Sequence, residues 1–276
     1  MKRIYTFGHE QVERNITVGD IIENKNNNLK MTQVTAANQE EAEIIASQEI
    51  DMIITGSDWY QDVRKGAPNT FITAALFAGR FITHEEILRG AFDVMMAGAD
   101  SVLTPRSFDV VEMLAKEGMQ VQGHVGMVPS MATKYGGIRT VGKTADEAVA
   151  ILKDMKRLED AGAFGAEVEC VAEDALIEIK KHTSLVINSL GSGSGGDVMF
   201  LFFEDICGET TGIKMPRHAK SWGDGKQIKR QLNEERSKAI QGFKTEVDNN
   251  TYPDKEHIIE MLPGEKVQLL EELDKM

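Results

Sequence analysis

The feature that most constrains the fold is a regular alternation of short apolar segments with longer amphipathic ones. The apolar segments number eight and lie at residues 30–36, 51–56, 70–76, 100–104, 119–124, 166–170, 184–189 and 198–203. Stretches with helical periodicity lie between most of them, at 38–49, 83–99, 107–118, 144–163 and 172–182. Eight strands that alternate with helices are typical of a (β/α)8 barrel, and 276 residues is close to its usual length. We therefore predict an α/β protein with a (β/α)8 TIM barrel fold.

Three of the expected helices begin with strong capping residues. Asn38, Thr83 and Thr144 each precede a helical stretch with acidic residues in its first turn. Glu147 follows Thr144 at the spacing of a capping box. A doubly wound open sheet is the rival fold, but its dinucleotide-binding form needs a glycine-rich turn after the first strand. The sequence there, "TAANQEEA", contains no glycine, which favours the barrel.

The two ends of the chain differ from the middle. We expect residues 1–29 to form a lead-in, with the Asn-rich stretch 23–30 as a loop, and residues 30–250 to form the barrel. Residues 226–247 have helical periodicity and are candidates for the last barrel helix. Residues 251–276 are expected to form a charged helical tail, which packs either on its own barrel or on a neighbouring subunit.

The amino-acid composition argues against several classes of binding partner. The net charge of −13 argues against binding to nucleic acid or to anionic membranes. No run approaches the ~18 apolar residues of a membrane span, and the N-terminus lacks the apolar region of a signal peptide. Two cysteines in a chain of this length make no disulfide framework, and Cys170 is expected to be a buried, unreactive thiol. We expect a cytoplasmic protein that acts on a small molecule.

In a barrel of this type the active site lies at the C-terminal ends of the strands. Polar and charged side chains that follow the predicted strands are Ser57, Asp58, Thr104, Arg106, His124, Glu169, Asn188, Ser189, Glu204 and Asp205. Ser57, Asp58, Arg106 and Ser189 are the candidates for binding substrate. The glycine-rich stretch 191–196 is either a phosphate cradle or a flexible turn, and it lacks the lysine of a P-loop.

Two residues are candidates for proton transfer. Glu169 lies among Val168, Cys170 and Val171, so partial desolvation is expected to raise its pKa and to suit it to removing a proton beside a carbonyl group. The alternative is a structural carboxylate bonded to the backbone or to an arginine. His124 can hydrogen-bond a substrate oxygen, or it can be a satisfied structural residue.

The central sequence resembles the ketopantoate hydroxymethyltransferase family. The resemblance is carried by "GHVGMVPSMATKYGGIRTVGKTADEA" (123–148) and "LEDAGAFGAEVECV" (158–171). Weaker similarity extends to 31–56, 215–222 and 246–257, and so over nearly the whole chain.

The resemblance implies a (β/α)8 barrel of the phosphoenolpyruvate mutase/isocitrate lyase superfamily. It implies hydroxymethyl transfer from methylenetetrahydrofolate to 3-methyl-2-oxobutanoate in pantothenate biosynthesis, with Mg2+ bound to the keto acid. The family's catalytic glutamate maps to Glu169 and its histidine to His124. Its members are often decamers, so a homo-oligomer is expected.

The chain departs from the family at the metal site. The family has G-D-S after the second strand, where this chain has Gly56-Ser57-Asp58. The aspartate of A-D-L-P-F is replaced by Ala75. The carboxylates that hold Mg2+ are therefore missing from these positions.

Three further positions have changed as well. The lysine and glutamate of V-K-x-E-G-G are replaced by Leu103 and Pro105, and the tyrosine of T-A-Y-D by Ala37. Asp58 is a new carboxylate nearby and the candidate metal ligand, although adjacent residues of an extended chain point to opposite sides. Arg106 is a candidate for holding a substrate carboxylate in place of the metal's charge, with a surface salt bridge as the alternative.

Three functions remain open at this point. The first is a divergent hydroxymethyltransferase that uses Glu169 as a base on a small α-keto acid. The second is a C–C lyase, aldolase or isomerase that acts on another small carboxylate, with or without a metal. The third is a non-catalytic binding protein on the same scaffold.

Overall fold

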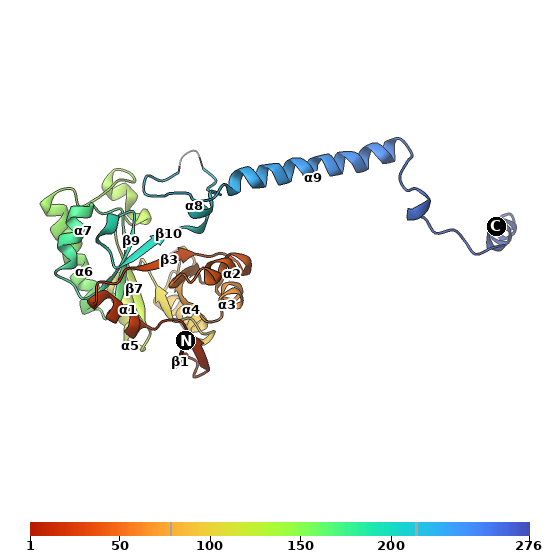
Figure 1. Ribbon diagram of the computed structural model, residues 1–276. Coiled ribbons are helices and arrows are strands. Elements are labelled where there is room, and N and C mark those ends of the chain that lie inside the picture. The colour runs from red at the N-terminus through yellow and green to blue at the C-terminus, as the bar shows by residue number, and fades with distance from the viewer. Residues whose placement is uncertain (78, 213–214) are drawn as a thin grey trace. The chain divides into compact units, whose positions relative to one another are not determined.

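Eight parallel strands close into a barrel in a computed structural model that describes residues 1–77, 79–212 and 215–276 (Figure 1). Around the barrel the strands follow the order β10-β3-β4-β5-β6-β7-β8-β9. Their bounds are β3 (Met31–Thr35), β4 (Met52–Gly56), β5 (Phe71–Ala75), β6 (Ser101–Leu103), β7 (Val121–Gly126), β8 (Gly165–Glu169), β9 (Val186–Leu190) and β10 (Val198–Leu201). Each lies within or overlaps one of the eight predicted segments, so the (β/α)8 prediction is confirmed.

The predicted helices surround the barrel (Figure 1). They are α2 (Gln39–Ser47), α4 (His84–Met96), α5 (Phe108–Lys116), α6 (Ala145–Asp160) and α7 (Glu173–Lys180). Asn38, Thr83 and Thr144 accept hydrogen bonds from the third residue of their helices, as their capping role predicts. At Thr144 the box is half formed, because the Glu147 carboxylate accepts from the Lys143 N–H and from Arg139 and not from the N–H of Thr144.

Two short helices were not predicted. Helix α3 (Tyr60–Gly66) follows β4 and buries Tyr60 and Val63. It packs so closely on α2 that a Cβ on Gly66 would collide with the carbonyl oxygen of Gln39. Helix α8 (Phe203–Cys207) follows β10 and has only five residues. Both are too short to show a clear period of 3.6 in the sequence.

The lead-in is more structured than predicted. Strands β1 (Lys2–Tyr5) and β2 (Gln11–Arg14) form an antiparallel hairpin, and α1 (Val18–Asn26) extends into the stretch that we expected to be a loop. Ile21 of α1 is fully buried against residues that begin the barrel strands: Met31, Met52, Phe71, Val186 and Val198. Helix α1 therefore closes the N-terminal end of the barrel.

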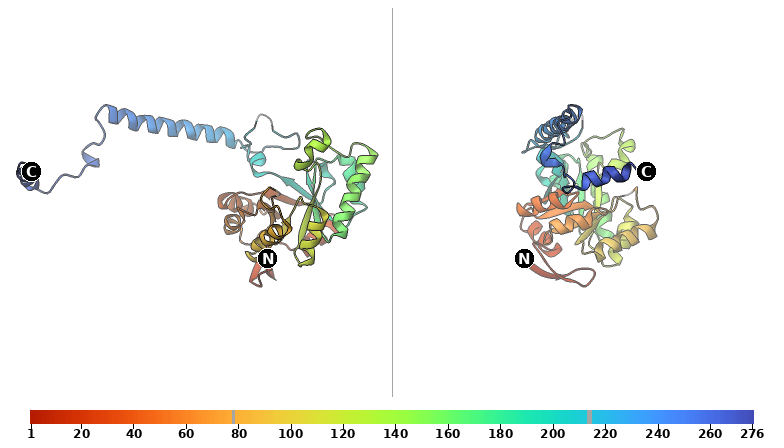
Figure 2. Two further views of the ribbon diagram at one scale, coloured as in Figure 1. Left: turned by 180° about the vertical axis from the view of Figure 1, so that it is seen from behind. Right: turned by 90° about the vertical axis from the view of Figure 1, so that its right-hand side faces the viewer.

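A buried arginine holds the hairpin to the same end. Arg14 of β2 donates to Asp100 at 2.7 Å and to the Gly98 carbonyl at 3.0 Å, just before β6. Arg64 donates to the other oxygen of Asp100 at 2.7 Å. In both views of Figure 2 the hairpin projects from one end of the barrel. The hairpin is therefore anchored away from the end where the strands finish.

A layer of polar side chains crosses the middle of the barrel. Gln122 donates to Thr73 at 3.0 Å, Thr73 and Ser101 share a bond of 2.8 Å, and Asn188 donates to Gln122. Because these groups are buried, their bonds to one another compensate for lost water. The layer also fixes which strand residues face inward: Gln122 and therefore His124, two residues on, share one side of β7.

The chain divides into two compact units, Met1–Gly223 and Asp224–Met276. The second contains α9 (Gly225–Asp248), the 3-10 turn η3 (Lys255–His257) and α10 (Glu265–Leu273), and none of its residues is buried. We expected the barrel to include residues up to 250, whereas α9 lies in the second unit. Within the described residues, no helix is long and apolar enough to cross a membrane.

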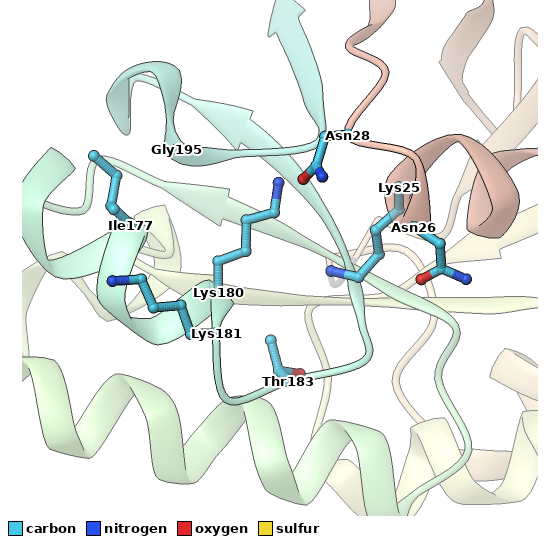
Figure 3. Close-up of a pocket in the computed structure, with 8 residues that line it drawn as sticks. All are labelled: Lys25, Asn26, Asn28, Ile177, Lys180, Lys181, Thr183 and Gly195. Carbon is cyan, nitrogen blue, oxygen red and sulfur yellow. The ribbon is translucent and has the colours of Figure 1, made fainter.

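A cavity of about 510 Å3 lies between the ends of α1 and α7 (Figure 3). Its lining is Lys25, Asn26, Asn28, Ile177, Lys180, Lys181, Thr183 and Gly195. Lys25 and Lys180 both bind Asp197, at 3.2 and 2.6 Å, and Lys181 pairs with Glu178 at 2.7 Å. These lysines stabilise a buried carboxylate and two helix ends, and the residues that resemble family site residues lie elsewhere.

Candidate active site

Three ionisable side chains meet near the C-terminal ends of β7 and β8. In the parallel ladder His124 is paired with Glu167, and Gly126 with Glu169. Glu167 and Glu169 are two residues apart on one strand, so both face the same side as His124. The Nε2 atom of His124 lies 3.0 Å from Oε2 of Glu169 and 3.6 Å from Oε1 of Glu167. The side chains of His124 and Glu167 are 9% exposed and that of Glu169 16%, so the cluster is largely shielded from water.

The glycines of the G-H-V-G motif explain why the chain can place His124 there. A Cβ on Gly123 would collide with the side chain of Leu158, so this glycine lets α6 pack against β7. Gly126 has φ +90°, and a Cβ there would collide with the carbonyl oxygen of Glu169. The motif thus permits close packing on either side of the histidine.

The environment perturbs the protonation of the cluster. Burial opposes the charged form of His124, but the hydrogen bond with Glu169 and the charges of both glutamates raise its pKa above the ordinary value. Burial raises the pKa of Glu167, which the His124 charge opposes and the Glu169 charge reinforces. The protonation of His124 and that of Glu167 therefore depend on the charges around them in the cluster.

Glu167 was not among the predicted site residues. The signal was present: in the buried strand "GAEVE" the two glutamates alternate with apolar residues, which puts both on one face. A search limited to residues at strand ends passes over Glu167, whereas the barrel places it at the level of His124.

The two polar residues after β4 point in different directions. Asp58 forms an ion pair with Arg80, and its side chain is 40% exposed. The Oγ atom of Ser57 is buried and has no hydrogen-bond partner among the described residues. Ser57 is held through its backbone, whose N–H donates to Ala75 at 3.0 Å. The structure thus leaves Asp58 at the surface, whereas the Ser57 hydroxyl is buried and unpartnered among the described residues.

Arg106 and Ser189 are both engaged with the backbone. Arg106 donates to the carbonyl oxygens of Phe81 at 3.2 Å and Ile82 at 3.0 Å, in the segment after β5. Ser189 donates to Gly193 at 2.8 Å, on the opposite side of β9 from the inward-facing layer.

The glycine-rich stretch 191–196 is a turn between β9 and β10. The Ser194 N–H donates to Glu173 at 2.7 Å, and Lys30 binds two carbonyl oxygens of the turn. The turn is thus held by a carboxylate and a lysine from neighbouring elements. Of the two interpretations of this stretch, these contacts favour a structural turn.

Part of the place where the family resemblance puts magnesium does not fit a hard cation. Ala75, which stands for a metal-site aspartate in the resemblance, and Leu103, which stands for the lysine, belong to one buried apolar cluster with Ile54, Leu190 and Phe200. Mg2+ requires oxygen ligands, and the side chains of this cluster supply none. The loss of the metal-site carboxylates is thus accompanied by apolar packing at the same place.

A second histidine, His218, lies beside the cluster and was not among the predicted site residues. Its ring lies against Gly191, where a Cβ would be 2.8 Å from Nδ1 of His218 and 3.2 Å from Sγ of Cys170. Its Nε2 atom is buried without a partner among the described residues. Burial lowers the pKa of His218, although the charges of Asp205 and Glu169 act in the opposite direction. His218 is therefore a neutral imidazole close to the site.

Cys170 follows Glu169 directly and adopts φ +50°, which is uncommon for a residue other than glycine. Burial raises the pKa of its thiol, and the Glu169 charge adds to this effect. The thiol is therefore protonated at neutral pH, as expected of an unreactive cysteine, but Cys170 is half-buried and not buried as predicted.

The three side chains that meet at β7 and β8 are of the types that bind metals. One ligand atom from each of His124, Glu167 and Glu169 lies within 4.8 Å of the others. A barrel with acid–base groups at the C-terminal ends of its strands has the arrangement of an enzyme active site.

The particular family follows from sequence comparison. A profile of the ketopantoate hydroxymethyltransferase family matches residues 57–255, and the chain belongs to this family. It is 28% identical over 256 residues to 3-methyl-2-oxobutanoate hydroxymethyltransferase of Francisella tularensis subsp. tularensis (strain FSC 198), which covers 83% of this chain and 93% of the relative. It is 33% identical over 183 residues to the enzyme of that name from Cenarchaeum symbiosum (strain A), covering 65% of this chain and 67% of the relative.

Solved structures confirm the fold. The chain is similar to 2,3-dimethylmalate lyase, a member of the PEP mutase/isocitrate lyase superfamily, with a TM-score of 0.50, 11% identity and coverage of 94% of this chain and 100% of that chain. It is also similar to phosphonopyruvate hydrolase in complex with oxalate and Mg++, with a TM-score of 0.51, 11% identity and coverage of 93% and 99%.

Proposed function

We propose that this enzyme removes a proton from a small α-keto acid and forms a carbon–carbon bond at the carbon that lost it. The default reaction is hydroxymethyl transfer from methylenetetrahydrofolate to 3-methyl-2-oxobutanoate. The observation that carries the proposal is the contact of 3.0 Å between His124 and Glu169, formed by the two family motifs. Family membership supports the same reaction class.

Each residue of the pair has a distinct role in this proposal. The C3–H bond of the keto acid breaks, its proton passes to the Glu169 carboxylate, and the electron pair delocalises into the enolate. His124 positions the carboxylate and donates to an oxygen of the substrate. Water hydrolyses the N–CH2–N bridge of the folate, so that both C–N bonds break, tetrahydrofolate leaves with its nitrogens protonated and formaldehyde is released. The enolate carbon attacks the formaldehyde carbon, and the resulting alkoxide takes the proton back from Glu169.

The four candidates for substrate binding are given different roles in this proposal. The unpartnered Oγ atom of Ser57 is available to an incoming carboxylate or keto oxygen. Arg106 and Ser189 bind backbone carbonyls, so we assign them to shaping the loops around the site. Asp58 is paired with Arg80 and is not proposed as a metal ligand.

A second function is favoured by one observation. The apolar cluster around Ala75 and Leu103 occupies the positions of one metal-site aspartate and of the lysine in the family pattern. Because charged residues of the family's site are replaced by apolar ones here, we propose lyase, aldolase or isomerase chemistry on another small carboxylate as the second function. A homo-oligomer in the cytoplasm is proposed for either function.

Hydrogen exchange tests the proposal. The enzyme is incubated with 3-methyl-2-oxobutanoate in D2O, and loss of the C3 proton signal is followed by NMR. We expect Glu169→Gln to slow exchange by about 10²–10⁴-fold. Glu178→Gln, which changes an exposed carboxylate on α7, is the matched control and should exchange at the wild-type rate.

The outcomes separate the two functions. Equal rates in the wild type and in Glu169→Gln would contradict the role of Glu169. Exchange with another keto acid but not with 3-methyl-2-oxobutanoate would favour the second function over the default reaction.

A further inference from the structure

We propose that His124, Glu167 and Glu169 bind a divalent transition-metal ion, at a place distinct from the family's magnesium positions. The inference deepens the proposed function, because it rests on the same reaction taking place at this cluster. Binding of the ion itself can be measured without any substrate.

The distances match those between ligands that share one ion. Nitrogen and oxygen ligands bind first-row metals at about 2.1 Å, so two ligands at right angles are about 3.0 Å apart and two at 120° about 3.6 Å. Nε2 of His124 lies 3.0 Å from Oε2 of Glu169 and 3.6 Å from Oε1 of Glu167. An ion placed among them needs only a small approach of the two carboxylates, whose ligand atoms lie within 4.8 Å.

The burial of Glu167 is the second argument. Its side chain is 9% exposed, and among the described residues it makes an ion pair of 3.6 Å with His124 but no hydrogen bond. A carboxylate in this position is costly unless a cation compensates its charge. Asn188, the ladder partner of Glu167, also has a buried Oδ1 atom with no hydrogen-bond partner in the described part of the chain. Strands β8 and β9 therefore present buried oxygen atoms, on Glu167 and Asn188, that accept no hydrogen bond from the described residues.

The ligand types select the ion. One imidazole nitrogen with two carboxylates suits Zn2+, Mn2+ or Fe2+ better than Mg2+, which prefers oxygen ligands. Three protein ligands leave coordination positions open, as in catalytic sites. The keto and carboxylate oxygens of an α-keto acid are a suitable bidentate ligand for those positions.

Coordination is compatible with the proposed base, although Nε2 of His124 then binds the ion instead of hydrogen-bonding Glu169, and the ion contacts the substrate oxygen in its place. Glu169 faces His124 through Oε2, so binding of the ion by this oxygen leaves Oε1 for proton transfer. A bound ion supplies positive charge that polarises the keto group and stabilises the enolate. The apolar side chains of Ala75 and Leu103 cannot supply that charge.

Titration with Co2+ and Zn2+ tests the site. The purified full-length protein is treated with a chelator, dialysed, and titrated by calorimetry and by visible absorption for Co2+. We expect one equivalent to bind, and Glu167→Gln and His124→Asn to weaken binding at least 10-fold. Glu178→Gln should bind as the wild type does. Thermal unfolding is recorded alongside, and Zn2+ should raise the melting temperature of the wild type more than that of Glu167→Gln.

The result separates this inference from the proposed function. Absence of stoichiometric binding, or equal binding by the wild type and a folded Glu167→Gln, overturns the metal site. Hydrogen exchange that persists at the full rate in excess chelator also overturns it, while leaving the proposed function in place. One bound equivalent without exchange on any keto acid supports the site and contradicts the proposed function.

Discussion

Gly126 lies opposite Glu169 in the β7–β8 ladder, so close that a Cβ on Gly126 would collide with the Glu169 carbonyl oxygen. The backbone of Gly126 has φ +90°, which residues with side chains rarely adopt. The last glycine of G-H-V-G therefore sets the position of the glutamate of E-C-V, although the two motifs are far apart in the sequence.

Replacing Gly126 by alanine should displace Glu169. The added methyl meets backbone, which cannot swing away as a side chain can, and the φ value adds strain. We expect Gly126→Ala to lower the free energy of unfolding by about 2–4 kcal/mol and to slow hydrogen exchange at the keto acid. Urea denaturation and NMR measure the two effects.

A matched control separates strain from contact. Gly118 has φ +83° but no atom within 4 Å of an added Cβ. Gly118→Ala should therefore cost only the conformational part, about 1 kcal/mol, and leave exchange unchanged. Equal effects of the two substitutions would show that the approach of Gly126 to Glu169 is unimportant.

The barrel could be predicted because its strands are short apolar runs separated by well-capped helices. Asn38 and Thr83 mark helix starts by local chemistry alone, and the structure places their caps as expected. Helix α1 could not be predicted in this way, because what stabilises it is the burial of Ile21 against strands that lie far along the chain.

The two halves of the candidate site differ in how far the sequence predicts them. His124 and Glu169 stand in motifs whose glycines signal close backbone contacts. Glu167 is recognised as a site residue only from the strand register, which pairs it with His124. The contact of His218 with Gly191 joins residues that are far apart in the sequence, so no local sequence pattern predicts that His218 lies near the site.

Returning a carboxylate to the family's metal position should destabilise the protein. Ala75→Asp places a charge among the apolar side chains of Ile54 and Leu103. We expect a loss of about 2–4 kcal/mol in the free energy of unfolding at pH 7, without stabilisation by Mg2+. Ala75→Asn has a similar volume without the charge and should lose less. A Mg2+-dependent rise in the melting temperature of Ala75→Asp would contradict this.

Glu159 should make stability depend on pH. Burial opposes its charge, but hydrogen bonds from Lys156 and Ser184 outweigh this and lower its pKa to about 2 from 4.5. A lowered pKa stabilises the folded state above pH 4.5, and the stabilisation is lost as the pH falls toward 2. The full shift corresponds to at most about 3 kcal/mol, and we expect about 1–2 kcal/mol because the side chain is 22% exposed.

The measurement compares Glu159→Gln with the wild type by urea denaturation at several pH values. The difference in unfolding free energy should be largest near pH 7 and shrink below pH 4.5. Glu178→Gln, whose carboxylate pairs with an exposed lysine, should show little difference at any pH. A difference for Glu159→Gln that is constant with pH would rule out the linkage.

The second unit should contribute to assembly more than to folding. Helix α9 exposes Ile228, Leu232, Ile240 and Phe243, which are 63%, 48%, 70% and 56% accessible, at spacings that place them along one face. Because none of the residues 224–276 is buried in the single chain, a chain that ends at Gly223 should still unfold in one cooperative transition, at a urea concentration lowered only by the lost assembly. Its mass by light scattering should be that of a smaller assembly, since an apolar helical face is covered by a second copy in the proposed homo-oligomer.

Substitutions on α9 test the same face in the full chain. The double substitution Ile240→Asp and Phe243→Asp places two charges on the apolar face and should reduce the mass as the shortening does. Lys238→Asp changes a charge on the other side of the same helix and should leave the mass unchanged. An unchanged mass for the shortened chain would contradict a role of α9 in assembly, because the exposed apolar residues would then have no partner to lose.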